Sequence, residues 1–183
     1  MRLKNRLSVL VIASTAILAY SNYANAAGTL SGQIGVEVTI GSGCSVLNST
    51  DTTPTNTWGT LNFGQYSDLQ NTINGSLVGT GGETGLQVTC TDQLAYKLSF
   101  DEGLNSSAGL RRLKYNDTNY IPYHLYSDAG YTAEILTGEI DRIGTGSLES
   151  IPVYGRILPS DQSNKISPTA GKYVDTVTAT LSW

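Results

Sequence analysis

The sequence predicts an all-β domain, and three observations support this. Short runs of alternating apolar and polar residues recur along the chain, and clusters of Gly, Asn, Asp and Pro separate them. No window of twelve residues has the apolar spacing of an amphipathic helix. Gly, Thr, Ser, Tyr, Val and Leu dominate the composition. Many short strands with frequent turns are typical of a sandwich or a barrel.

Residues 1–26 are expected to be a signal peptide that is not part of the fold. Three basic residues precede an apolar run at residues 7–18, and Ala24-Asn25-Ala26 is a small-x-small cleavage signal. The apolar run is shorter than the about 20 residues that a permanent membrane span needs. Removing 26 of the 183 residues leaves 157, enough for one domain with one sizeable core.

The processed chain is acidic. The signal peptide carries three of the eleven basic residues and none of the fifteen acids, so cleavage leaves a formal charge of −7. Nucleic-acid binding needs clustered Lys and Arg to neutralise phosphates, and the remaining basic residues are scattered. We therefore expect an exported protein with no nucleic-acid partner.

The longest alternation begins directly behind the signal peptide. From Leu30 to Ile40, every second residue is apolar or Gly, and polar residues or Gly35 lie between them. A strand of about eleven residues is roughly twice the average length. Half of it could leave the domain and pair elsewhere, although the pattern also fits a long first strand of an ordinary sandwich.

Eight further strands are expected in a domain that spans residues 38–183. They are placed at residues 60–66, 85–91, 94–100, 110–114, 121–126, 132–137, 151–157 and 174–183.

The last of these strands has an unusual ending. One face carries Tyr173, Val177, Ala179, Leu181 and Trp183, with Asp175 interrupting it. The sequence stops on Trp183 in mid-pattern, whereas most domains end in a few residues of slack. We expect the final strand to leave an open edge, which soluble monomers avoid.

Cys44 and Cys90 are expected to form a disulfide, because two cysteines in an exported chain lie at the ends of predicted strands. Closing a loop of about 46 residues would stabilise the fold by roughly 4 kcal/mol in a chain-entropy estimate. Two thiols and one histidine at no ligand spacing do not make a metal site.

No residues form a catalytic signature, so we do not expect an enzyme or a small-molecule cofactor. His124 is the only histidine, and no nucleophile motif accompanies it, so a hydrogen-bonded strand histidine is the simpler interpretation. Asp101, Glu102 and Asp141 lie beside Gly or in predicted loops, where turn chemistry explains them without glycosidase activity. The Gly79–Gly82 stretch lacks the Lys-Ser/Thr of a phosphate loop.

The eleven tyrosines allow a second hypothesis, a monomeric secreted or periplasmic carbohydrate-binding sandwich. Tyr115, Tyr120, Tyr123 and Tyr126 could form a binding platform, although tyrosines more often cover a sheet as amphipathic packing. This hypothesis requires a complete sandwich and a dispensable N-terminal segment.

Several stretches resemble the spore coat protein U domain family, in the family's order. They are the closing GKYVDTVTATLSW, WGTLNFGQY at Trp58–Tyr66, LQVTC at Leu86–Cys90, YHLYSDAG at Tyr123–Gly130 and VYGRI at Val153–Ile157. The opening SGQIGVEVTIGSGC is most similar to subunits of Csu-type pili, the archaic chaperone–usher class.

The resemblance implies an incomplete immunoglobulin-like sandwich that lacks its last strand and is completed by a donor strand. In this family a periplasmic chaperone supplies that strand first, and the N-terminal segment of the next pilin subunit then replaces it. An outer-membrane usher would be a further partner. The chain would then be a structural subunit of a surface pilus on a Gram-negative bacterium, serving attachment and biofilm formation.

Two sets of residues follow from this resemblance. Residues 27–37 would be the donor segment, with Leu30, Gly32, Ile34 and Val36 entering the neighbour, while Val38 and Ile40 stay mainly in the home sandwich. The groove edge that pairs with a chaperone or donor strand would carry Val177, Ala179, Leu181 and Trp183.

Overall fold

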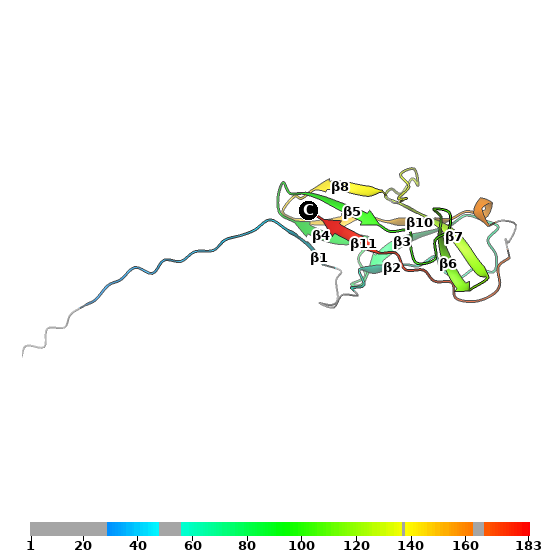
Figure 1. Ribbon diagram of the computed structural model, residues 1–183, viewed down its shortest axis with the longest axis horizontal. Coiled ribbons are helices and arrows are strands. Elements are labelled where there is room, and N and C mark those ends of the chain that lie inside the picture. The colour runs from blue at the N-terminus through cyan, green and yellow to red at the C-terminus, as the bar shows by residue number, and fades with distance from the viewer. Residues whose placement is uncertain (1–28, 48–55, 137, 163–166) are drawn as a thin grey trace, which may run out of the picture. The chain divides into compact units, whose positions relative to one another are not determined.

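The structure is a computed structural model that describes residues 29–47, 56–136, 138–162 and 167–183. The signal peptide predicted at residues 1–26 lies outside this part of the chain. Residues 40–183 form one compact unit, and the residues before Ile40 belong to a separate one. The described part of the compact unit contains eleven strands and one short 3₁₀ helix, η1 (Pro159–Asp161) (Figure 1).

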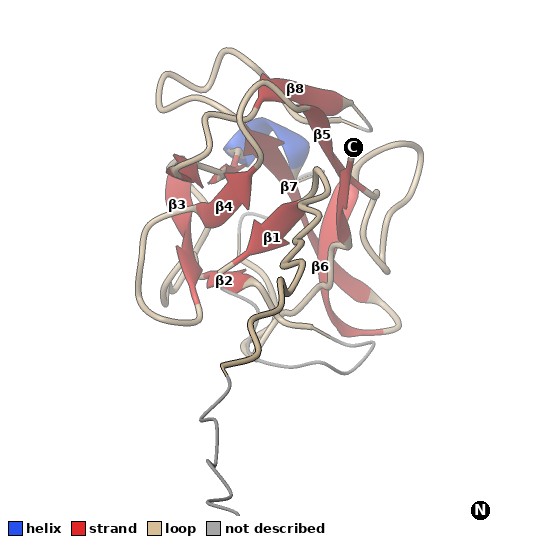
Figure 2. Ribbon diagram, turned by 90° about the vertical axis from the view of Figure 1, so that its left-hand side faces the viewer, coloured by secondary structure: helices blue, strands red, loops and turns tan. Residues whose placement is uncertain are grey.

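The strands form three antiparallel sheets. The first has the order β1 (Cys44–Val46), β4 (Leu86–Cys90), β9 (Leu148–Ile151). The second has the order β2 (Gly59–Leu61), β3 (Ile73–Gly79), β10 (Tyr154–Ile157), β7 (Asn119–Tyr126), β6 (Arg111–Asn116). The third has the order β11 (Ala179–Ser182), β5 (Ala95–Phe100), β8 (Glu139–Ile143). Figures 1 and 2 both place the C-terminus beside β5 and β8.

All three sheets contribute to one apolar core, as in a sandwich. The alternation along β5 buries Tyr96, Leu98 and Phe100, because successive side chains of a strand point to opposite faces. β7 buries Ile121, Tyr123 and Leu125 in the same way, and β4 adds Leu86 and Val88. These residues belong to one contiguous cluster. The all-β prediction is confirmed.

The disulfide expected from the sequence is present between Cys44 and Cys90. The two residues lie opposite each other in the β1–β4 pair, so the bond fixes the first strand of the domain to a buried central strand. A further backbone hydrogen bond, from Thr91 N to Gly43 O at 3.0 Å, extends this attachment by one residue.

The strands predicted at 85–91, 94–100, 110–114 and 121–126 correspond to β4, β5, β6 and β7. The prediction at 60–66 is longer than β2, and the prediction at 174–183 is longer than β11. The strand predicted at 151–157 is interrupted after Ile151, where Pro152 has no N–H to donate to a ladder.

The strand predicted at 132–137 is wrong in the described part of that range. Only one bridge, Tyr126 with Glu134, forms there, because the Asp128 carboxylate accepts hydrogen bonds from the backbone N–H groups of Thr132 and Ala133 and holds a turn. The sequence also missed β1, β3 and β8. β3 contains Gly75, where a Cβ would lie 3.0 Å from Leu61 Cδ2 and 3.2 Å from Phe63 Cδ1.

Candidate functional site: an open groove beside the last strand

Two strand edges on either side of a groove have no neighbour among the described residues. β2 is the first strand of the five-stranded sheet, and β11 is the first strand of the sheet that contains β5. Each has one partner, β3 or β5, and presents its other row of backbone N–H and C=O groups without a strand beside it. Such an edge is a ready template for pairing with another chain.

A cavity of about 170 Å³ lies between these edges. Gly59, Leu61 and Phe63 line it from the β2 side, and Asp175, Val177 and Ala179 line it from the C-terminal segment. We call this segment, residues 173–183, the last strand; its ladder with β5 is β11. Its remaining lining comes from the core and consists of Leu77, Leu86, Phe100, Leu113, Tyr123, Leu125 and Val153. The lining is apolar apart from the Asp175 carboxylate and the Tyr123 hydroxyl. The groove therefore opens directly into the hydrophobic core.

The last strand turns one face toward this core. Tyr173, Val177, Ala179 and Leu181 are half-buried and pack against the core cluster, and Asp175 on the same face is also half-buried. The residues of the other face are exposed. Of the four predicted groove-edge residues, Val177 and Ala179 line the cavity, and Leu181 packs against the core beyond it. Trp183 differs, because 62% of its surface is exposed.

The last strand changes partners along its length. Val174 pairs with Lys114 of β6 through two backbone hydrogen bonds, of 2.8 and 2.9 Å. Thr178 then donates its backbone N–H to the Asp101 carboxylate at 2.8 Å and accepts from the Asp101 N–H at 3.0 Å. Burial alone would raise the pKa of Asp101, but the hydrogen bonds from Thr178 and Gly103 lower it. An ionised Asp101 thus holds the strand where it crosses from β6 to β5.

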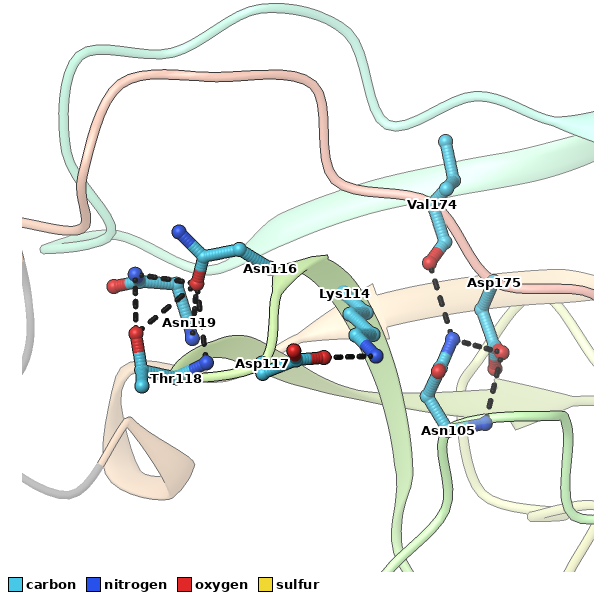
Figure 3. Close-up of polar contacts among 8 residues, drawn as sticks. All are labelled: Asn105, Lys114, Asn116, Asp117, Thr118, Asn119, Val174 and Asp175. Carbon is cyan, nitrogen blue, oxygen red and sulfur yellow. Dashed lines mark hydrogen bonds and ion pairs between the residues drawn. The ribbon is translucent and has the colours of Figure 1, made fainter.

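Asp175 is the polar point of the groove. Its carboxylate accepts hydrogen bonds from the Tyr123 hydroxyl at 2.8 Å, the Asn105 side-chain amide at 2.9 Å and the Asn105 backbone N–H at 3.2 Å (Figure 3 shows the Asn105 contacts). Burial and the contact with Asp175 raise the pKa of Tyr123, so its hydroxyl keeps the proton that it donates. Asp175, which interrupts the apolar face, therefore has hydrogen-bond partners. A charged group in apolar surroundings requires such partners.

The N-terminal segment, residues 30–40, has the opposite environment. It forms no strand (Figure 1), and its apolar side chains are exposed. The exposed fractions of Leu30, Ile34 and Val36 are 102%, 89% and 93%. Beside Gly32, Gly35 and Gly41 there is open space where a side chain would be. The segment thus presents an exposed apolar edge.

The division of this segment predicted from the sequence stays a prediction. Val38 and Ile40, expected mainly in the home sandwich, are 82% and 87% exposed. Gly43 accepts a backbone hydrogen bond from Thr91, and the β1 ladder follows from Cys44. The exposed apolar edge therefore continues to Ile40.

His124 lies on the outer face of β7, away from the groove. Its Nδ1 is 2.5 Å from Glu134 Oε1 and its Nε2 is 2.8 Å from Asp161 Oδ2. Burial alone would lower the pKa of His124, but the two carboxylate hydrogen bonds raise it. An imidazolium satisfies both contacts, since it donates from both nitrogens. The interpretation of His124 as a hydrogen-bonded strand residue agrees with this geometry.

The other polar candidates also have structural partners. Lys97 contacts both Glu139 and Asp141, at 2.5 and 3.7 Å. Gly79 N–H donates to the Glu83 carbonyl at 2.7 Å in a turn that contains Gly82 with positive φ. Among the described residues, no cluster of His, Cys, Asp or Glu could hold a metal ion. No helix in the same ranges has the length and apolar character to cross a membrane.

The tyrosines do not form the platform named from the sequence. Tyr123 is buried and lines the groove, while Tyr115 packs against Tyr173 at 5.5 Å between ring centroids. Tyr120 stacks beneath the Arg112 guanidinium at 4.2 Å. Tyr126 packs edge-on against Tyr131, at 5.4 Å between ring centroids. Each of the four rings thus has a different neighbour.

The sequence could have indicated one wall of the groove that the prediction did not assign. Leu61 and Phe63 stand two residues apart in WGTLNFGQY, a spacing that puts both on one face of an extended segment. The partners of Asp175 had no such signal, because Asn105 and Tyr123 are 70 and 52 residues away in the sequence.

The model of the Spore Coat Protein U domain family matches residues 30–180, which include the N-terminal segment, the disulfide and most of the last strand. The chain belongs to this family. The resemblance found in the sequence motifs is thereby confirmed. No curated protein matches this family member by sequence.

Solved structures with a similar fold include pilus proteins. One is a chain of the CsuC–CsuE chaperone–tip adhesion subunit pre-assembly complex from archaic chaperone–usher Csu pili of Acinetobacter baumannii. It has 19% identity and a TM-score of 0.51, and the match covers 79% of this chain and 40% of that one. The P pilus rod subunit PapA has 13% identity and a TM-score of 0.45, with 76% and 97% covered. This chain thus spans less than half of the Csu chain, with which it shares its sandwich fold.

Proposed function

We propose that this protein is a structural pilus subunit that polymerises by donor-strand complementation. One observation carries the proposal. The chain has an apolar groove without a strand between two free edges, and it also has an exposed segment with the alternation of the strand that would fill it. The open groove and the exposed segment would each destabilise a monomer. In two copies, the segment of one would fill the groove of the other.

We propose a donor segment of residues 30–40, which extends further toward the domain than the 27–37 expected from the sequence, and it would bind as an added β-strand. Its backbone would pair with the free edge of β11, and its alternate side chains would enter the groove. Leu30, Ile34 and Val36 are the expected anchors, and burying three such side chains contributes on the order of 5–9 kcal/mol before the costs of association. Gly32 would mark a point where the backbones approach closely.

The assembly would be a filament. A subunit that donates from one surface and accepts in another makes a head-to-tail contact, which gives an open polymer when it does not close into a ring. Before assembly the groove has to be covered, so we infer a periplasmic chaperone as the first partner and an outer-membrane usher as the exit. The expected location is a cell-surface pilus that serves attachment and biofilm formation.

The family membership supports this proposal, and so does the fold shared with a chain of the archaic chaperone–usher complex. The alternative carbohydrate-binding module is less consistent with the structure, because it requires a closed sandwich. The groove leads into the core, and the tyrosines proposed as its platform are dispersed.

The proposal is tested by exporting the processed chain to the periplasm and comparing it with a version that lacks residues 27–40. Size exclusion and unboiled, non-reducing gels should show a ladder of oligomers from the full chain and none from the truncation. A single stable monomer from both would contradict the proposal and would direct the next assays to sugar binding.

A further inference from the structure

A second apolar surface lies at the end of the domain where β5, β8 and β11 meet. Trp183 and Ile143 are 62% and 61% exposed there, and together with Ala95 they line an open hollow of about 710 Å³. Two views agree that the C-terminus lies beside β5 at this end (Figures 1 and 2). We call Ala95, Ile143 and Trp183 the end patch. It is separate from the groove cavity, since the two share no lining residue.

The end patch lies beside the residue from which the N-terminal segment departs. A Cβ placed on Gly43 would be 3.9 Å from Trp183 Nε1. Gly43 also accepts a backbone hydrogen bond from Thr91, and Gly144, next to Ile143, accepts one from Gln93. The base of the N-terminal segment, the 91–93 turn and the end of β8 therefore form one surface of the domain.

Only three residues separate the donor segment from β1. They are Gly41, Ser42 and Gly43, and four chain steps from Ile40 to Cys44 span at most about 14 Å. If the apolar edge up to Ile40 enters a neighbour, the body of that neighbour has to lie within this distance of Cys44. A longer linker would allow the domains of the donating and accepting subunits to lie apart. A linker of three residues keeps them close to each other.

From these observations we infer that the end patch is a second contact between subunits, covered by the body of the copy that accepts this chain's donor segment. The inference rests on the proposed function, because it takes the donor segment to be held by a second copy. It adds a contact between bodies, which donation alone does not require.

The chemistry of the end patch suits such a contact. Its apolar centre is bordered by Lys97, Asp141 and Arg142, and protein interfaces combine a hydrophobic core with a polar rim. Lys97 and Asp141 already form an ion pair at 3.7 Å, so covering the patch would not leave these two charges without partners. A large exposed indole beside an exposed Ile is the kind of anchor that contributes most to association.

Photocrosslinking in full-length polymers tests the inference. The crosslinker p-benzoylphenylalanine replaces Ile143, and in a matched chain it replaces Val78, which is also exposed but lies on β3 in another sheet. Both chains should give the wild-type ladder on unboiled gels. After irradiation and boiling, position 143 should give several-fold more covalent dimer than position 78, with the crosslink mapping to a neighbouring subunit.

The controls separate this inference from the proposed function. Polymers that form normally but crosslink no better from position 143 than from position 78 would overturn the end-patch contact and leave donation intact. Absence of a ladder from the wild-type chain would instead refute the proposed function. As a second readout, Ile143→Asp should keep the ladder and yield filaments that are more flexible in negative-stain images, and unchanged filaments would count against the contact.

Discussion

The N-terminal segment and the last strand have the same alternation of apolar and polar residues, but only the last strand is packed against the core. Both alternate apolar with polar residues over about eleven positions. The last strand packs Tyr173, Val177, Ala179 and Leu181 against the core, whereas the N-terminal segment exposes its apolar residues to solvent. Alternation therefore shows that a segment can be a half-buried strand, but the availability of a partner edge decides whether it becomes one.

The difference lies in the contacts that anchor each segment. The last strand is held by β6 at Val174, by Asp101 at Thr178 and by β5 along Ala179–Ser182. At the start of the domain, Gly43 pairs with Thr91 beside the disulfide, and the apolar residues that precede it are exposed. In the proposed polymer, the N-terminal segment would receive a backbone partner and apolar packing from another copy. The last strand receives both from its own chain.

The largest effect is expected from Ile34→Asp. A carboxylate entering the apolar groove without a partner costs several kcal/mol, so donation should weaken about a hundredfold or more and the polymer ladder should disappear. Gln33→Asp is the matched control, because its side chain is on the polar edge of the segment. Filaments of normal length from Ile34→Asp would show that the donor assignment is wrong.

The next effect concerns the border between the two regions. Replacing both Cys44 and Cys90 by Ser removes the link that fixes β1 to β4, and the loop of 46 residues it closes corresponds to about 4 kcal/mol. Guanidinium unfolding of polymers should shift to a clearly lower midpoint in the double variant. An unchanged midpoint would mean that the β1–β4 ladder alone defines where the domain begins.

A smaller effect is expected from the polar network in the groove. Asp175→Ala leaves the Tyr123 hydroxyl and the Asn105 backbone N–H without their acceptor, at a cost of about 1–3 kcal/mol. Thr176→Ala, at the adjacent exposed position, should change the free energy of unfolding little. If the two variants unfold at the same denaturant concentration, the Asp175 network does not stabilise the last strand.

The smallest effect lies outside both regions, at His124. Hydrogen bonds to Glu134 and Asp161 raise its pKa in the folded state, so its contribution is complete below the unfolded pKa of about 6.5 and is lost as pH rises through the folded pKa. Melting temperatures should fall over this window in the wild type and less in His124→Gln. Parallel curves would show that the histidine does not carry the dependence.

The sequence predicted the parts of the fold whose local pattern and burial agree. β4, β5 and β7 alternate clearly and are buried, and the apolar face of the last strand was predicted for the same reason. β8 was missed because three of its five residues, Glu139, Asp141 and Arg142, are charged and its pattern carries little apolar signal.

The candidate site was only partly accessible from the sequence. Its apolar lining from the last strand follows from alternation, but the Asp175 network depends on contacts across 52 and 70 residues. The assignment of Val38 and Ile40 to the home sandwich stays a prediction for a different reason. Their pattern describes a strand, and no pattern within one chain says which chain supplies the neighbouring edge.

The most direct test of the central claim is amide hydrogen exchange on full-length polymers, with the Ile34→Asp chain as the unassembled reference. We predict that residues 30–40 become protected in the polymer together with those amides of Ala179–Ser182 that do not bond to β5, and that both groups exchange rapidly in the variant. Polymers in which residues 30–40 exchange as fast as an unstructured peptide would contradict donor-strand complementation by this segment.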